Sequence, residues 1–158
     1  MQKQKIHGWL LFWLIIFLAF VCHNIQSIIK LSITYSHQSI DYLGLFYLVC
    51  PIILALFELY MVWSFFKFRT DAVFLGKSVF FITLVLNLIS SFYDIIMLDL
   101  LKLFLFTVIQ AIWLFFLIGS EQVKQLFPKE KRCVPVYDYF IIGAAITIPV
   151  IIILVGIL

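Results

Sequence analysis

The sequence predicts an all-α fold, a polytopic transmembrane helix bundle with about five spans. Hydrophobic residues make up 65% of the 158 residues, charged residues only 12%, and the mean hydropathy is +1.18. A soluble domain of this size exposes roughly a third of its unfolded surface, and this chain has too few polar side chains to cover it. We therefore expect residues 1–158 to form a single transmembrane domain whose partner is the lipid bilayer.

Five apolar runs approach the ~20 residues that cross a hydrocarbon core of about 30 Å. The predicted spans are residues 8–29, 43–66, 78–93, 103–119 and 139–158. The first run is longer than the apolar region of a signal peptide and lacks a small-residue cleavage site, so we expect it to be retained. The third and fourth runs are the shortest and are expected to form a tight helical hairpin.

The fifth run carries no charge and contains the small residues Gly143, Ala144 and Ala145. Small residues let a neighbouring helix approach closely, which favours packing against a helix of this chain or of a partner. A simple membrane anchor is the alternative.

Basic residues alternate along the chain and predict its orientation. Nine lysines and arginines fall before the first span, between the second and third, and between the fourth and fifth, whereas two fall in the remaining connections. The positive-inside rule places the nine, and with them the N-terminus, in the cytoplasm. Because topology explains these charges, the net charge of +3 does not indicate a nucleic-acid partner.

Three polar residues form the candidate intramembrane site: Glu58, Asn87 and Gln110. An ionised carboxylate inside a span is costly and faces a partner or water. Glu58 either binds a proton or cation, or is a protonated carboxyl that bonds to a neighbouring helix, and the second interpretation is favoured. Antiparallel packing would bring Asn87 and Gln110 together near mid-membrane, where their amides would bridge helices.

The sequence contains no catalytic or metal-binding motif. It lacks a nucleophile elbow, HExxH, a glycine-rich phosphate loop and the paired carboxylates of intramembrane proteases. Three cysteines give neither a disulfide framework nor a CxxC pair. We expect no enzymatic activity, no metal and no cofactor.

Several short motifs together resemble those of a bacterial family of small membrane proteins, the DUF2569 family. The chain opens with Gly8 and Trp9, and Glu58 lies inside the second span. The most specific match is a Trp followed by Ser-x-x-Val-Lys-x-x-Phe, formed by Trp113, Ser120, Val123, Lys124 and Phe127. The resemblance covers about residues 6–128 and implies four helices in a bacterial cell membrane, with the fifth appended. The family has no established activity that could be carried over.

Function is predicted at the level of class. The leading hypothesis is a non-enzymatic helper or interaction subunit of a membrane complex. The partners considered are a membrane protein and, by self-association, a second copy of this chain; self-association alone would favour transport. The alternative is a small oligomeric transporter or channel that uses Glu58. A membrane-resident immunity protein has the same architecture, but no residue argues for it. Residues 120–138 hold four basic and three acidic side chains, and either contact anionic lipid headgroups or dock a cytoplasmic partner.

Overall fold

A computed structural model describes residues 6, 8–36, 40–93 and 97–157, apart from some side chains between 87 and 106 and those of Leu43 and Ile157. Every regular element in these ranges is helical, which confirms the predicted all-α class. The α-helices are α1 (Gly8–Tyr35), α2 (Tyr42–Phe66), α3 (Ala72–Tyr93), α4 (Met97–Gly119), α5 (Glu121–Leu126) and α6 (Val136–Ile157). A short 3-10 helix, η1 (Lys129–Lys131), lies between α5 and α6.

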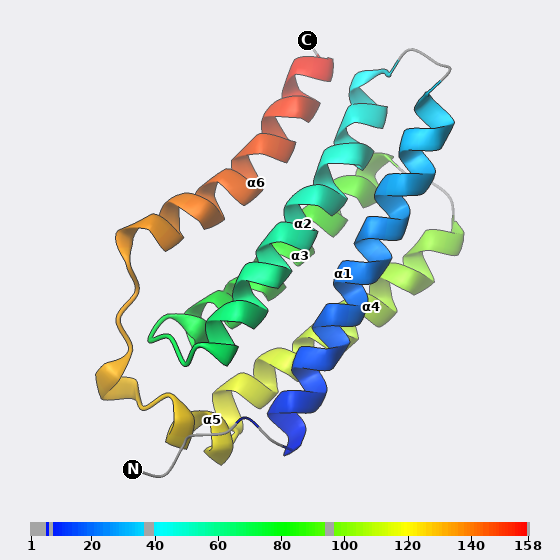
Figure 1. The fold of residues 1–158 in the computed structure, drawn as a ribbon. Helices are drawn as coiled ribbons and strands as arrows, with labels where there is room; N and C mark the ends of the chain where they lie inside the picture. The colour runs from blue at the N-terminus through cyan, green and yellow to red at the C-terminus, as the bar shows by residue number, and fades with distance from the viewer. Residues whose placement is uncertain (1–5, 7, 37–39, 94–96, 158) are drawn as a thin grey trace.

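The five long helices alternate in direction (Figure 1). Helix α2 packs against α1, α3 and α6, and α4 packs against α3. Within the described residues, α1, α2 and α6 are long and apolar enough to cross a membrane, while α3 and α4 contribute shorter apolar stretches, Ala72–Leu86 and Thr107–Gly119. This arrangement agrees with a bundle of about five spans.

The loop 67–71 and the segment 120–135 lie toward the same end of the bundle as the start of α1 (Figure 1). We call this end, defined by those two segments, the basic end. It carries most of the lysines and arginines that the structure describes. The two segments can therefore contact each other although about fifty residues of chain separate them.

Several helices extend beyond the predicted apolar runs. Helix α1 continues to Tyr35 rather than residue 29, α3 begins at Ala72 rather than 78, and α4 begins at Met97 rather than 103. A helix satisfies its own backbone hydrogen bonds, so it can continue past the hydrocarbon into the polar interface. The length of an apolar run therefore underestimates the length of the helix.

Trp113 joins four helices in the core. Its side chain is fully buried, and its ring lies 5.1 Å from that of Phe17 and 5.9 Å from that of Phe65, measured between centroids. Its Nε1 donates a hydrogen bond of 3.0 Å to the backbone carbonyl of Gly76. One indole of α4 therefore contacts α1, α2 and α3, and it also satisfies its own donor.

Gly76 permits the close approach of α3 to α2 and α4. A Cβ at this position would lie 2.8 Å from Cδ1 of Leu117 and 3.2 Å from the ring of Phe65. Both distances are shorter than ordinary carbon contacts, so the side chains of Leu117 and Phe65 would have to move to admit a Cβ.

We predict that Trp113→Ala destabilises the bundle by about 3–5 kcal/mol, the usual cost of truncating a buried aromatic side chain. Thermal unfolding of the purified protein in detergent micelles measures the effect. The matched control is Phe115→Ala, because Phe115 lies on the same helix and is 74% exposed. Equal losses of stability in the two variants would contradict the central role of Trp113.

Candidate functional site

The structure places two of the three predicted intramembrane residues in the interior. Glu58 on α2 and Gln110 on α4 are each 3% exposed. The side chain of Asn87, and hence the predicted bridge between Asn87 and Gln110, lies outside the described residues. No hydrogen bond joins Glu58 to Gln110 in the part of the chain that the structure describes.

Glu58 is instead paired with Asn24 of α1. The Asn24 Nδ2 donates a hydrogen bond of 3.1 Å to Oε2 of Glu58. The two residues are 34 positions apart, so the contact depends on the register between α1 and α2. A carboxyl group that bonds to a neighbouring helix of the same chain fits the structural interpretation of Glu58.

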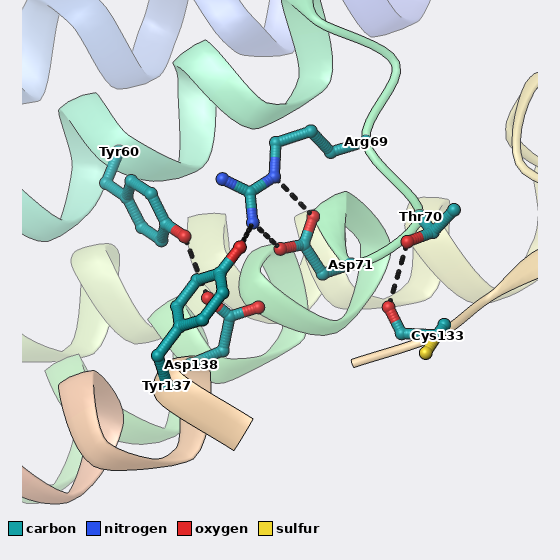
Figure 2. A network of polar contacts seen from close by, with 7 residues as sticks. All are labelled: Tyr60, Arg69, Thr70, Asp71, Cys133, Tyr137 and Asp138. Atoms are coloured by element: carbon teal, nitrogen blue, oxygen red, sulfur yellow. Dashed lines mark hydrogen bonds and ion pairs between the residues drawn. The ribbon is translucent and has the colours of Figure 1, made fainter. Parts of the chain in front are cut away.

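A second and larger group of polar side chains lies at the basic end, and we call it the polar cluster (Figure 2). It gathers residues from α2, from the loop 67–71 and from the first turn of α6. Asp71 and Asp138 are both fully buried. The members of the cluster are Tyr60, Arg69, Asp71, Tyr137 and Asp138.

Arg69 is the centre of the polar cluster. Its Nε donates a hydrogen bond of 3.1 Å to Oδ1 of Asp71, and its Nη2 donates to Oδ2 of Asp71 and to the hydroxyl of Tyr137. Burial alone would lower the pKa of Arg69, but the hydrogen bonds and charge of Asp71 outweigh it and raise the pKa. The guanidinium therefore stays charged at any physiological pH.

Aromatic rings surround the same guanidinium. Its central carbon lies 5.3 Å from the ring centroid of Tyr60, 5.1 Å from that of Trp63 and 5.6 Å from that of Tyr137. Each distance is within the range of a cation–π contact. Two of the rings belong to α2 and one belongs to α6. Arg69 therefore connects the two helices through cation–π contacts as well as through the hydrogen bonds of its N–H groups.

The second carboxyl group of the cluster, Asp138, is held by Tyr60. The Tyr60 hydroxyl donates a hydrogen bond of 2.8 Å to Oδ1 of Asp138, and Oδ2 has no hydrogen-bond partner among the described residues. Asp71 lies close enough to Asp138 for the two carboxylates to repel each other. Two buried carboxyl groups thus share one cation, and when both are ionised the cluster carries one negative charge that Arg69 does not neutralise.

Helix ends supply the remaining stabilisation of these carboxyl groups. Asp71 directly precedes α3, and Asp138 is the third residue of α6. The N-terminal end of a helix carries a partial positive charge and unpaired N–H groups, which favour a nearby anion. The start of a helix therefore lowers the cost of a buried negative charge at both positions.

Sequence reasoning did not identify the polar cluster. Asp71 and Asp138 are 67 positions apart, and each looks like an ordinary interfacial acid next to a basic loop. The available signal was weak: each acid immediately adjoins the start of an apolar helix. Which two acids meet depends on how α3 and α6 pack.

The residues of the family-like motif have packing and capping positions. Val123 and Phe127 are 0% and 4% exposed, and the Ser120 hydroxyl accepts a hydrogen bond of 3.4 Å from the backbone N–H of Val123, which caps α5. Lys124 is exposed and paired with Glu121. These side chains position the segment after α4 against the bundle.

At the other end of the resemblance, Gly8 opens α1 with a φ of +58°, a left-handed conformation that glycine adopts without strain. Trp9 follows and is 68% exposed. An exposed Trp at a helix end is typical of a membrane interface.

Comparisons with known proteins found no match among family models, curated proteins or solved structures. The resemblance to the DUF2569 family stays a prediction. Among the described residues, no group of three or more His, Cys, Asp or Glu side chains is arranged to hold a metal ion.

We predict that Arg69→Gln destabilises the protein by about 3 kcal/mol, because it leaves two buried carboxyl groups without a cation. The matched control is Lys67→Gln, which removes the same charge from an exposed position at the same end. Its effect should stay within about 0.5 kcal/mol. Thermal unfolding in detergent compares the two, and a similar loss in both would show that the polar cluster does not stabilise the fold.

A double-mutant cycle tests the pair in the membrane interior. Asn24→Leu, Glu58→Leu and the double variant should give a coupling energy of about 0.6 kcal/mol and at most ~1.7 kcal/mol, the range of hydrogen bonds between membrane helices. Additive losses would mean that the two side chains do not stabilise each other.

Proposed function

We propose that this protein is a non-catalytic, multi-pass protein of the bacterial cell membrane that serves as an interaction subunit of a membrane complex. In this proposal the basic end faces the cytoplasm, as the distribution of lysine and arginine predicts. The polar residues inside the bundle hold its own helices together, and the outward side of α6 contacts the partner.

The observation that carries the proposal is the outward side of α6. Gly143 is exposed, and a Cβ at that position would meet nothing within 4 Å. Thr147, one turn further, is exposed as well. Two small residues separated by four positions allow a second helix to approach closely in a membrane. None of the described helices takes that place.

Large side chains border this small-residue surface. Phe140 is 75% exposed, Ile151 is 51% exposed and Leu154 is 55% exposed. They lie at helical spacing with Gly143 and Thr147, so the five residues share one face. Small residues between large ones give a shallow depression that a transmembrane helix fills by van der Waals packing, the main attraction between helices in lipid.

The inward side of α6 packs against other helices of the chain. Ala145 is 5% exposed and belongs to the core, and α6 packs against α2 and α3. The polar cluster fixes the start of the helix through Tyr137 and Asp138. Because the protein itself holds α6 in place, its outward face is available in a defined orientation, as an interaction surface requires.

Gentle-detergent purification from the native membrane, followed by mass spectrometry, tests the proposal. We expect a stoichiometric membrane partner with the wild type and its loss with Gly143→Leu, because the larger side chain prevents close approach. Gly119→Leu is the matched control: this glycine of α4 is also exposed, and a Cβ there would also meet nothing within 4 Å. It should retain the partner.

A wild-type chain that purifies alone or only with itself would contradict the interaction role and favour transport. Transport has its own measurement, ion or solute flux in proteoliposomes. Flux that Glu58→Gln abolishes without loss of folding would assign the carboxyl group a transport role. We expect no flux from the wild type or from the Glu58→Gln variant.

A further inference from the structure

A small pocket lies where the connection between α4 and α6 meets the loop 67–71. Its volume is about 170 Å³, far more than the ~30 Å³ that one water molecule occupies in the liquid. Its lining combines apolar and cationic side chains. The apolar lining residues are Phe68, Leu126, Phe127 and Pro128, and the polar ones are Thr70, Lys131 and Arg132.

The two cations of the pocket have no carboxylate partner in the described chain, where the ion pairs are Arg69–Asp71 and Lys124–Glu121. Arg132 is nevertheless held in position, because its Nε donates a hydrogen bond of 2.9 Å to the carbonyl of Phe127. Its terminal amino groups remain as donors, and a planar guanidinium matches the oxygens of a phosphate group.

Phe68, one of the apolar lining residues, has an unusual backbone conformation. Phe68 has a φ of +50°, which a bulky side chain rarely adopts. Its ring stacks on that of Phe127, with 6.2 Å between centroids and 24° between planes. Strained conformations of this kind persist where surrounding structure enforces them, and they concentrate at binding sites.

A second contact joins the two segments that form the pocket. The Thr70 hydroxyl donates a hydrogen bond of 3.0 Å to the carbonyl of Cys133 (Figure 2). This bond closes the segment that follows η1 against the loop 67–71. Contacts within the protein therefore hold both of these segments in place.

We propose that this pocket binds the phosphate group of an anionic phospholipid. The pocket lies just beyond the last turns of α2 and α4, at the end of the bundle where headgroups of a surrounding membrane would be found. A phospholipid presents phosphate oxygens next to glycerol and acyl carbons, which matches a pocket lined by both cationic and apolar side chains. Basic pockets at this level of a membrane protein bind anionic headgroups. The site is separate from the interaction face of α6.

Native mass spectrometry of the full chain tests the site, in mixed micelles with equal amounts of phosphatidylglycerol and phosphatidylcholine. We expect the wild type to retain phosphatidylglycerol preferentially. Lys131→Gln with Arg132→Gln should reduce that preference by about tenfold or more, because a direct hydrogen bond between charged groups contributes about that factor. Leu126→Trp keeps every charge but fills the pocket, and it should also reduce the preference.

The matched control is Lys67→Gln with Lys129→Gln, which removes the same charge from exposed positions at the same end but outside the pocket. It should keep a preference close to that of the wild type. If it loses as much as the pocket variant, or if a folded Leu126→Trp variant loses nothing, the attraction belongs to the general surface charge and the proposal is wrong. If Leu126→Trp fails to fold, judged by thermal unfolding, the two charge variants decide.

Inorganic phosphate separates the two sources of a phosphate group. The wild type should retain phosphatidylglycerol when millimolar inorganic phosphate is added, because only the lipid also contacts the apolar lining residues. Displacement of the lipid by inorganic phosphate would overturn the assignment to a phospholipid and identify a site for free phosphate.

Discussion

The ion pair between Arg69 and Asp71 is the interaction on which the arrangement of α6 depends. It places a charged guanidinium where the hydroxyl of Tyr137 and the rings of α2 can reach it. Asp138 then bonds to Tyr60, so the first turn of α6 is attached to α2 through Asp138 and to the loop 67–71 through Tyr137. Bonds of this kind are stronger at the edge of a membrane than in water, because the surrounding dielectric constant is lower. The helix that carries the proposed interaction face owes its position to them.

Inside the bundle a different constraint applies. Lipid is as apolar as leucine, so hydrophobic burial does not drive helices together, and close packing has to supply the attraction. Trp113 and Gly76 illustrate the result: a large ring touches several helices, and a missing side chain lets the backbones approach. Lipid also offers no hydrogen bonds, which explains why the Trp113 donor and the Glu58 carboxyl are each satisfied by a group on another helix.

The two proposed contacts of the protein lie on different parts of its surface. The outward side of α6 is apolar with small residues in its middle, and suits a transmembrane helix. The pocket between the loop 67–71 and residues 126–132 is lined in part by cationic side chains, and suits a phosphate group. The segment after α4 connects them, because it forms one wall of the pocket and then leads into α6. A lipid bound in the pocket would therefore contact the segment that precedes the interaction helix.

The sequence by itself determined the class of the protein: composition and the length of the apolar runs required a helical bundle in lipid, and residue type alone singled out Glu58. The helix ends predicted from the sequence were less accurate, because a helix continues into the interface after its apolar run stops. Tertiary structure decided the partners. Three contacts depend on how the helices are rotated and shifted against one another. They are the hydrogen bond from Asn24 to Glu58, the proximity of Asp138 to Asp71, and the hydrogen bond from Thr70 to the carbonyl of Cys133. Those rotations follow from side-chain packing between distant segments, which the periodicity of any single segment does not record.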